Sequence, residues 1–472
     1  MLATENKMTG GNTILDSLRR QRVLIVGLGA TGLSCARFLA AQGVEVAVTD
    51  SRANPPGLDV LQKELSDTAV FVGGFESGAF ERADVLLLSP GVSLREPLVA
   101  EARARGVEIL GDVELFARLV AAPVIAITGS NGKSTVTTLV GAMAQAAGRH
   151  VALGGNIGTP VLDLLNPAKA QLAHDLYVLE LSSFQLETTQ SLETVAATIL
   201  NISEDHMDRY ASLADYTAAK ARIFHGSEVL IVNRDDARVA ATLEMLRCGR
   251  RLIHFGLQPA AKGDFGVFEQ GGENWLCLGD EALMPVADLH LRGQHNLANA
   301  LAALALGQAA GLPMAAMLET LQHFGGLPHR CQWLGEYRGV GWYNDSKATN
   351  VGAAIAAISG VEAEKIVLIA GGQGKGQDFT PLVEPLRQRA RAVVLLGEDS
   401  GVIEAALQNS FTADALSLRH VQNMAEAVSL AAELAQTGDA VLLSPACASF
   451  DMFAGFEQRG EVFMHQVESQ LK

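Results

Sequence analysis

The chain has 472 residues, and at roughly 150 residues a domain this length predicts about three domains. Its formal net charge of −16 disfavours nucleic acids and anionic membranes as partners, because both bind broad basic surfaces. The five cysteines show no C-x-x-C spacing, which argues against a disulfide framework and a structural zinc site and favours a reducing cytoplasm.

Residues 1–20 mix charged and polar residues and contain no apolar core of signal-peptide length, so we expect a loosely ordered lead-in. The uncharged stretch 293–318 is interrupted by polar residues such as Asn296 and by Pro313. These interruptions argue against a membrane span. We expect a buried helix followed by a turn, and no insertion into a membrane.

Strand, turn and helix alternate over 21–117, which predicts a first α/β domain. The apolar strand 23–26 leads into the glycine-rich turn 27–32, and Asp50 ends the next strand. This pattern is the dinucleotide-binding fingerprint, and alone it indicates an NAD-dependent oxidoreductase. Another ligand with a diphosphate meets the same physical requirement, since a helix N-terminus holds the phosphates in both cases. A purely structural turn is the third interpretation.

A second domain, over 118–326, begins with an apolar strand and the turn Ile-Thr-Gly-Ser-Asn-Gly-Lys-Ser-Thr at 127–135. A strand, glycine turn and helix in this order cradle a triphosphate, because backbone N–H groups at the helix N-terminus face the phosphates. Lys133 adds a positive charge, and the hydroxyl of Ser134 or Thr135 can reach a phosphate-bound Mg²⁺. A strict Walker A motif would begin with glycine where this chain has isoleucine, so generic kinases and GTPases are disfavoured.

Polar residues follow later strands of this domain. Glu180 ends an apolar strand, where an acid that holds a metal ion belongs beside a phosphate turn; a solvated strand end is the alternative. His206 lies among acids, and we expect a functional role in preference to a structural one. Lys220 lies on an expected helix, where a lysine is usually solvated. Asn296 and Asn299 are one helical turn apart, so both amides can face a purine edge, unless Asn296 caps the helix.

A third α/β domain is expected over 327–472, after the string Gly-Gly-Leu-Pro at 325–328, which we interpret as a hinge. Arg330 lies just past this hinge, so its guanidinium can close on a γ-phosphate bound in the second domain. The polar turns 344–350 and 371–376 each follow a strand and carry a lysine, so small anions would fit there.

Taken together, these strings resemble the Mur ligase family, the ATP-dependent enzymes that add amino acids to the cytoplasmic peptidoglycan precursor. The match extends over nearly the whole chain after residue 20 and is closest to members that add D-glutamate to UDP-N-acetylmuramoyl-L-alanine. It implies an N-terminal Rossmann-like domain that binds UDP, a central P-loop-type ATPase domain and a C-terminal Rossmann-like domain. The strings that carry the resemblance are 27–32, 128–135, 154–158, 179–187, 204–210 and 444–449.

The resemblance implies a mechanism. ATP would phosphorylate the substrate carboxylate, the amine of D-glutamate would attack the acyl phosphate, and ADP and phosphate would leave. It further implies a monomeric cytoplasmic enzyme with small-molecule substrates, two Mg²⁺ ions and a CO₂-derived carbamate on Lys220, which replaces the solvated interpretation of that lysine. A sister ligase that adds L-alanine to UDP-N-acetylmuramate is one alternative; an NAD-dependent oxidoreductase and a non-catalytic nucleotide-binding scaffold are the others.

The resemblance also assigns roles to residues at matching positions, with Ser51 and Phe450 standing where threonine and leucine are usual. It implies that Lys133, Glu180, His206, Lys220 and Arg330 are catalytic, and that Ser134, Glu180, His206 and Lys220 hold the metal ions. The residues expected to bind ATP are Thr128, Gly129, Ser130, Asn131, Gly132, Lys133, Ser134, Thr135, Asn296, Asn299, Arg330 and Asp345. Those expected to bind the UDP-linked substrate are Ala30, Thr31, Ser51, Arg52, Gly91, Asn156, Ser182 and His206. Those expected to bind D-glutamate are Lys347, Thr349, Lys375, Ser449, Phe450 and Phe456.

Overall fold

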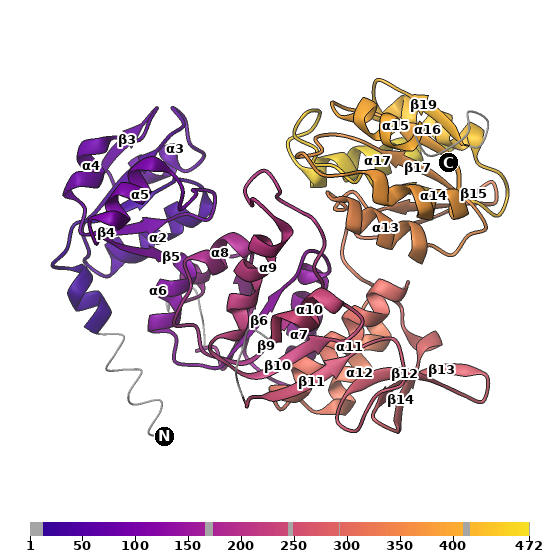
Figure 1. Cartoon of the computed structure of the whole chain (residues 1–472), viewed down its shortest axis with the longest axis horizontal. Coiled ribbons are helices and arrows are strands. Elements are labelled where there is room, and N and C mark those ends of the chain that lie inside the picture. The colour runs from indigo at the N-terminus through magenta and orange to yellow at the C-terminus, as the bar shows by residue number, and fades with distance from the viewer. Residues whose placement is uncertain (1–12, 166–172, 244–248, 292, 409–415, 472) are drawn as a thin grey trace.

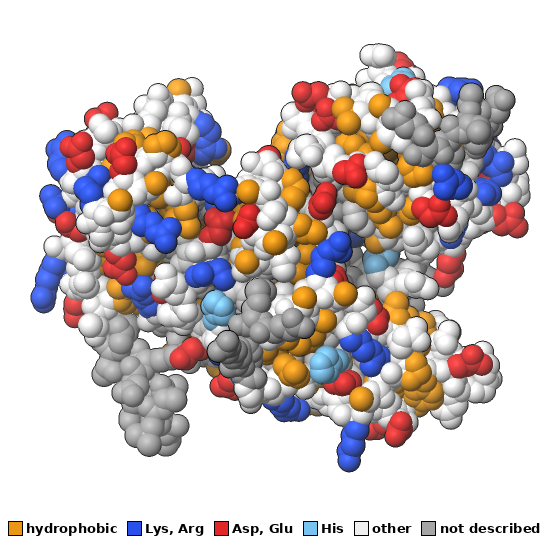
Figure 2. Space-filling model, in the orientation of Figure 1, with side chains coloured by type: hydrophobic (Ala, Val, Ile, Leu, Met, Phe, Trp, Pro, Cys, Tyr) orange, Lys and Arg blue, Asp and Glu red, His pale blue; other side chains and the backbone are white. Residues whose placement is uncertain are grey.

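The computed structural model describes residues 13–165, 173–243, 249–291, 293–408 and 416–471. The strands of these residues form three sheets, one in each of three α/β domains, which confirms the predicted fold class (Figure 1). The first and third domains each adjoin the second, the first through α2 and the third through α13, which contacts α11. On the face drawn in Figure 2, acidic and basic side chains are interspersed, and the surface is hollowed between the first and third domains.

The first domain has a parallel sheet with the strand order β3-β2-β1-β4-β5 among the described residues. The apolar strands β1 and β4 are buried along their whole length, as central strands of a parallel sheet covered on both faces should be. The strand order reverses beside β1, and ligands of such sheets bind at the carboxyl ends of the strands there. The elements are β1 (Val23–Val26), α2 (Ala30–Ala41), β2 (Val46–Asp50), α3 (Leu58–Glu64), β3 (Ala69–Val72), α4 (Ser77–Arg82), β4 (Val85–Leu88), α5 (Pro97–Ala104) and β5 (Glu108–Gly111).

The lead-in expected over residues 1–20 is partly described. Residues 1–12 lie outside the described residues, whereas 13–18 form a helix. Leu18 is buried and belongs to the core that also contains Val23 and Leu39. The expectation of a loosely ordered segment is therefore wrong for 13–18, because apolar side chains of this helix pack against the first domain.

The second domain has a sheet with the order β14-β13-β12-β11-β10-β9-β6-β8-β7. It is parallel from β7 to β12 and ends in the antiparallel strands β13 and β14. Its elements are α6 (Asp112–Leu119), β6 (Val124–Thr128), α7 (Lys133–Ala146), β7 (Val151–Gly155), η1 (Val161–Leu165), β8 (Leu176–Glu180), α8 (Ser183–Glu187), β9 (Thr194–Ile199), α9 (Leu213–Ala221), η2 (Arg222–Phe224), β10 (Ser227–Asn233), α10 (Ala237–Thr242), β11 (Arg251–Phe255), β12 (Phe265–Gln270), β13 (Glu273–Leu278), β14 (Glu281–Pro285), η4 (Val286–Asp288), α11 (Gln294–Ala309) and α12 (Met314–His323).

The uncharged stretch 293–318 forms the buried helix α11, then a turn, then the start of α12, as predicted. α11 packs against α7 over the sheet, in the same apolar core as β6 and β9. Over the described ranges, no helix combines the length and the apolar character needed to cross a membrane.

The third domain has the strand order β15-β16-β20-β17-β18-β19, with β15 antiparallel to β16 and the other described pairs parallel. It follows the string 325–328, which contains no helix or strand and in which Gly326 has a φ of 88°. Its elements are β15 (Gln332–Tyr337), β16 (Val340–Asn344), α13 (Val351–Gly360), β17 (Ile366–Ala370), η5 (Thr380–Leu382), α14 (Val383–Arg389), β18 (Ala390–Leu395), α15 (Ser400–Gln408), β19 (Ser417–His420), α16 (Met424–Leu434), β20 (Ala440–Leu443) and α17 (Phe456–Leu471).

Candidate active site

The phosphate turn joins the buried strand β6 to α7, which begins at Lys133. Gly129 and Gly132 have φ values of 153° and 83°, in a backbone region that favours glycine. A Cβ at Gly132 would lie 2.5 Å from Oδ1 of Asn299, so the turn packs closely against α11. The N–H groups in the first turn of a helix have no partner within it, so this turn is suited to hold phosphates.

Two lysines converge on this turn. Nζ of Lys133 donates to the carbonyls of Gly129 and Ser130 over 2.8 and 2.9 Å. Nζ of Lys220, on α9, donates to the same Gly129 carbonyl over 2.8 Å and lies 4.6 Å from the ring centre of Tyr216. Lys220 is only 1% exposed, so the solvated interpretation of this lysine is wrong. Burial lowers the pKa of both amines, and that of Lys220 falls well below its usual value.

Glu180 ends β8 beside the phosphate turn and is buried, so it is not a solvated strand end. Its Oε2 accepts a hydrogen bond from Oγ of Ser134 over 2.6 Å, and its Oε1 accepts one from Nδ2 of Asn156 over 2.8 Å. Nη2 of Arg330 donates to Oγ of Ser134 over 2.7 Å, although Arg330 belongs to the third domain. The structure therefore links four predicted site residues in one hydrogen-bond chain across the domain boundary.

His206 lies in the loop after β9 with a φ of 58°, which is uncommon for a residue other than glycine. Its ring centre lies 4.8 Å from that of Phe184, and its Nε2 lies 3.6 Å from Oδ2 of Asp205. Burial lowers the pKa of His206, so its imidazole is mainly neutral at pH 7 and can accept a hydrogen bond or bind a metal ion. Oδ1 of Asp205 also lies 3.7 Å from Nζ of Lys375 in the third domain.

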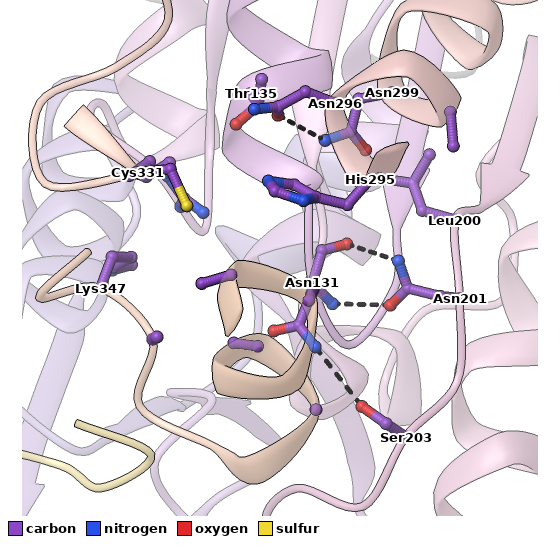
Figure 3. A pocket seen from close by; sticks show the side chains of 18 of the residues that line it. Asn131, Thr135, Leu200, Asn201, Ser203, His295, Asn296, Asn299, Cys331 and Lys347 are labelled. Atoms are coloured by element: carbon purple, nitrogen blue, oxygen red, sulfur yellow. Dashed lines mark hydrogen bonds between the residues drawn. The ribbon is translucent and has the colours of Figure 1, made fainter. Parts of the chain in front are cut away.

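A pocket of about 350 Å³ lies between α11 and the third domain (Figure 3). Asn296 and Asn299 line it, and Nδ2 of Asn299 donates to Oδ1 of Asn296 over 3.3 Å, so the two amides are neighbours as predicted. Gly293 occupies the N-cap position of α11, so the capping interpretation of Asn296 is wrong. Figure 3 shows Cys331 and Lys347 on the wall opposite these amides.

A second pocket, of about 560 Å³, lies between the phosphate turn and the third domain and contains the carboxylate of Glu180. Residues predicted for three different ligands meet in its lining, which is the arrangement that a transfer between two of those ligands requires. The predicted residues that line it are Ser130, Asn131, Gly132, Lys133, Ser134, Asn156, Glu180, His206, Arg330, Lys347, Thr349 and Phe456.

Asp345 and Lys347 follow β16; Asp345 lines the smaller pocket, and Lys347 lines both. Asp345 accepts hydrogen bonds from Oγ of Ser444 over 2.8 Å and from the N–H of Cys331 over 3.1 Å, while burial raises its pKa to about 7. Nζ of Lys347 lies 3.5 Å from the ring centre of Phe456, and burial lowers the pKa of Lys347 to about 8. An ammonium held over an aromatic ring at a pocket wall is placed to meet a carboxylate.

The phosphate turn also contacts the third domain through a pair of side-chain amides. Nδ2 of Asn350 donates to Oδ1 of Asn131 over 3.1 Å, and Nδ2 of Asn131 donates to Oδ1 of Asn350 over 3.3 Å. Asn350 also caps α13, where its Oδ1 accepts from the N–H of Ala353, and it donates to Oδ2 of Asp205. The third domain is therefore held against the turn by a residue that begins one of its helices.

The residues predicted for the UDP moiety lie around the carboxyl ends of β1, β2 and β4, apart from both pockets. Asp50, the acid of the dinucleotide fingerprint, accepts hydrogen bonds from the N–H of Leu28 over 2.7 Å and from Arg52 through Nε and Nη2. Both carboxylate oxygens of Asp50 therefore have partners within the protein. The residues placed at this edge are Ala30, Thr31, Ser51, Arg52 and Gly91.

Besides the five residues at this edge of the first domain, seven predicted residues line neither pocket: Thr128, Gly129, Ser182, Lys220, Lys375, Ser449 and Phe450. Ser182 caps α8 and accepts from the N–H of Gln185, in a reciprocal capping box. Lys375 faces Asp205, and Ser449 is buried at 2% exposure, whereas Phe450 is 70% exposed. The side chain of Phe450 therefore lies at the protein surface, unlike that of its neighbour Ser449.

Across the described residues, no group of three or more His, Cys, Asp or Glu side chains is placed to hold a metal ion. Ser134 and Glu180 nevertheless present two adjacent oxygens beside the phosphate turn. Mg²⁺ in nucleotide sites commonly takes one or two protein oxygens and completes its shell with phosphates and water, so these two residues fit such an ion.

The sequence reasoning missed Asp205 and Asn350 as individual site residues. Both lie in strings that were singled out, 204–210 and 344–350. Asn350 could have been found as an N-cap, since an asparagine stands directly before an apolar helix. Its pairing with Asn131 could not have been found, because 219 positions separate the two residues.

Three family models match successive parts of the chain: the Mur ligase MurD-like N-terminal domain at residues 21–111, the Mur ligase middle domain at 127–307, and the Mur ligase glutamate ligase domain at 329–447. Solved structures agree in fold. UDP-N-acetylmuramate-alanine ligase from Thermotoga maritima aligns with a TM-score of 0.58 at 17% identity, over 95% of this chain and 99% of its own. MurF from Acinetobacter baumannii aligns with a TM-score of 0.58 at 16% identity, over 96% of this chain and 98% of the MurF chain.

The chain belongs to the Mur ligase family, which confirms the family predicted from its motifs. Within this family it is similar, over nearly its whole length, to proteins named UDP-N-acetylmuramoylalanine–D-glutamate ligase. The one from Nitrosococcus oceani is 56% identical over 449 residues, covering 95% of this chain and 96% of the relative. The one from Pseudomonas aeruginosa is 53% identical over 451 residues, covering 94% of this chain and 97% of the relative.

Proposed function

We propose that this protein is an ATP-dependent ligase that joins D-glutamate to UDP-N-acetylmuramoyl-L-alanine and releases ADP and phosphate. The observation that carries the proposal is the pocket of about 560 Å³, in which the phosphate turn, Glu180 and Lys347 face one another across two domains. The names of the relatives at 52 to 56% identity supply the amino acid and its configuration. Neither could be derived from the pocket itself.

The chemical problem is that a carboxylate does not react with an amine at neutral pH until one of its oxygens becomes a good leaving group. Transfer of the γ-phosphoryl group from ATP to the substrate carboxylate forms an acyl phosphate and ADP. The amine then attacks the acyl carbon, and the tetrahedral intermediate collapses to the amide and inorganic phosphate. Positioning and charge neutralisation supply most of the acceleration in such transfers.

The residues around the pocket match these tasks. The turn 128–135 holds the triphosphate, and Lys133 and Arg330 neutralise charge on the γ-phosphoryl group as it moves. Asn296 and Asn299 lie where the adenine edge would bind, with Asp345 at the ribose. Lys347 and Thr349 hold the carboxylates of D-glutamate, while His206 and Asn156 lie along the arm of the UDP-linked substrate.

Mg²⁺ is part of the proposal. Ser134 and Glu180 would hold one ion beside the phosphate turn, and His206 and a carbamate on Lys220 would hold a second. When bound, these ions polarise the phosphates and the substrate carboxylate.

The carbamate proposal rests on the place of Lys220. Lys220 is 1% exposed, and its amine donates to the carbonyl that Lys133 also binds; among the described residues, no carboxylate lies in hydrogen-bond contact with it. Because burial lowers the pKa of Lys220 well below its usual value, the amine is readily available in its neutral form. Addition of CO₂ to the neutral amine forms an N–C bond and releases one proton, and the product is an anion with two oxygen ligands. The carbamate would therefore place a negative charge beside the amine of Lys133.

The alternatives raised by the sequence are not favoured. The sister ligase that adds L-alanine is represented among the structures at 17% identity, against 56% for a D-glutamate ligase. For the NAD-dependent oxidoreductase, the acid that should bind the ribose is Asp50, whose oxygens are engaged by Leu28 and Arg52. We further propose that the protein acts as a monomer in the cytoplasm, where the resemblance places its substrates.

The test is a ligation assay with ATP, UDP-N-acetylmuramoyl-L-alanine and a panel of amino acids, with the product identified by mass spectrometry. We expect an amide product with D-glutamate and little with L-glutamate or L-alanine. If D-glutamate adds nothing over the background without amino acid, the proposed function is wrong. A parallel titration with NAD should show no nicotinamide binding, whereas binding of NAD without turnover of ATP would support the oxidoreductase.

A further inference from the structure

Arg209 connects the second domain to a loop of the first. It lies three residues after His206, and its Nη1 donates to the carbonyl of Pro90 over 2.8 Å, with a longer contact of 3.4 Å from Nη2 to the carbonyl of Val92. Nη2 also donates to Oε2 of Glu187 over 2.7 Å. The side chains of Arg209 and Glu187 are 13% and 18% exposed, so this ion pair is largely removed from water.

The loop that Arg209 holds also packs tightly on the glycine-rich turn of the first domain. Oγ of Ser89 donates to the carbonyl of Gly27 over 2.8 Å. A Cβ at Gly27 would lie 2.9 Å from Cβ of Ser89 and 3.2 Å from Cγ2 of Val92, so no space separates the loop from the turn. Gly91, between these contacts, is one of the residues predicted for the UDP moiety. The loop is therefore fixed on one side by the turn and on the other by Arg209.

The guanidinium of Arg209 also contacts an aromatic side chain that packs against His206. Its Cζ lies 4.1 Å from the ring centre of Phe184, and the ring of Phe184 lies 4.8 Å from that of His206. A cation over an aromatic face at this distance is attractive, more so when both are shielded from water. His206 lines the pocket that contains Glu180. Arg209 thus touches the loop of the first domain and the aromatic ring that supports His206.

We infer that Arg209 is a positioning residue that aligns the first domain with the second for a substrate that spans both. The inference rests on the proposed function, in which the diphosphate lies at the first domain and the reacting carboxylate at the second. If the two domains were loosely aligned, part of the binding free energy would be used to order them, and the carboxylate would meet the γ-phosphate less often in a reactive geometry. A hydrogen bond to the carbonyl of Pro90 and a longer one to that of Val92, both made by one largely buried cation, fix that alignment before the substrate binds.

The experiment compares ligands that touch one domain with the ligand that touches both. UDP alone is expected to contact only residues of the first domain, and ATP only the second and third. In Arg209→Ala, we expect the KM for UDP-N-acetylmuramoyl-L-alanine to rise on the order of tenfold, because hydrogen bonds from a charged group are lost. The KM for ATP and the Kd for UDP, measured by calorimetry, should stay within about twofold of the wild-type values.

Arg222 provides a matched control. Its Nε donates to the carbonyl of Leu186 over 2.6 Å and its Nη2 to that of Thr189 over 2.7 Å, on either side of Glu187. These bonds stay within the second domain. Arg222→Ala should therefore lower the melting temperature without a selective rise in the KM for the UDP-linked substrate.

A second variant separates alignment from an unpaired charge. Arg209→Ala leaves the carboxylate of Glu187 with little water and no cation, which by itself destabilises a fold. The double variant Arg209→Met with Glu187→Gln removes both charges and keeps most of the apolar volume. It should recover much of the melting temperature and retain the raised KM for the UDP-linked substrate.

The outcomes are distinct. The inference is overturned if Arg209→Ala weakens UDP alone as much as the whole substrate, if Arg222→Ala raises the same KM equally, or if the double variant restores that KM. If instead the wild-type protein does not turn over the UDP-linked substrate at all, the proposed function fails, and this is seen before any variant is made.

Discussion

The side-chain amines of Lys133 and Lys220 donate to the same carbonyl oxygen, that of Gly129, each over 2.8 Å. Burial first, and then the charge of Lys133, hold the pKa of Lys220 well below its usual value, because two ammonium groups on one oxygen would repel each other. A carbamate on Lys220 would instead attract the ammonium of Lys133 and favour its charged form, which is the form that meets the γ-phosphate. The geometry thus gives a physical reason for a modified lysine at this position.

Substitution of Lys220 tests this reason. Lys220→Ala should lower kcat by at least about 100-fold, because an anionic metal ligand is lost beside the transferred phosphoryl group. Added short carboxylates such as acetate should restore part of the activity by occupying the space of the carbamate, as measured by phosphate release. Lys133→Ala, treated in the same way, should not be rescued. Full activity of the unmodified protein after removal of CO₂ and bicarbonate would show that no carbamate is needed.

Lys133 has a separate role. Lys133→Ala should reduce kcat on the order of 10³-fold, since the charge that meets the γ-phosphate is removed from a water-poor site. Single-turnover measurements at saturating ATP would separate this loss from weaker nucleotide binding. Lys365→Ala is a suitable control, because Lys365 likewise donates to a backbone carbonyl, that of Gln388, but at an exposed position. Equal losses in the two variants would contradict a catalytic role for Lys133.

The pH dependence should report on Lys347. Burial lowers the pKa of Lys347 to about 8 from its usual value of 10.5, so the amine loses its proton earlier than a solvated lysine does. Below about pH 8 the ammonium can hold a carboxylate of D-glutamate, and above it the KM for D-glutamate should rise by up to about tenfold per pH unit. In Lys347→Arg the guanidinium stays charged, so this rise should disappear. If the KM for D-glutamate rises with pH equally in the wild type and in Lys347→Arg, a group other than Lys347 causes the rise.

The pair Asn131 and Asn350 should control how the third domain docks on the second. Asn350→Ala removes both amide contacts and should increase the radius of gyration of the ligand-free protein in solution scattering, through motion at 325–328. Asn423→Ala removes another N-cap asparagine, that of α16, which makes no contact across domains in the described structure. Asn423→Ala should lower the free energy of unfolding by about 1 kcal/mol without changing the radius of gyration. An unchanged radius in Asn350→Ala, with or without an ATP analogue, would contradict the hinge.

Much of the fold could be predicted because its central strands are continuous apolar runs. β1, β4, β6 and β17 are buried on both faces, and burial of that kind leaves a pattern in the sequence. β7 and β15 were not predicted, because they lie at the edges of their sheets and contain glycine or charged residues. Such strands are stabilised by pairing with a neighbouring strand, and the hydrophobic periodicity of the sequence does not reveal that pairing.

Some residues of the candidate site could likewise be predicted from the sequence, and others could not. The phosphate turn is local in sequence, so its glycines, Lys133 and Ser134 could be found from spacing alone. Lys220 could not, because its burial depends on the packing of α9 against the turn, and only the family resemblance identified it. Arg330 was anticipated from its place past the hinge, but its contact with Ser134 joins residues 196 positions apart. The contacts of Arg209 and Asn350 between domains lie beyond any local pattern.

The measurement that tests the account most directly follows an oxygen atom. UDP-N-acetylmuramoyl-L-alanine labelled with oxygen-18 in its carboxylate is incubated with ATP, D-glutamate and the protein, and the released phosphate is examined by mass spectrometry. An acyl phosphate intermediate requires one oxygen of the carboxylate to leave with the phosphorus, so each phosphate should carry a single oxygen-18 atom. Release of unlabelled phosphate would mean that water attacks ATP, and would contradict the assignment of this protein as a ligase that activates a carboxylate.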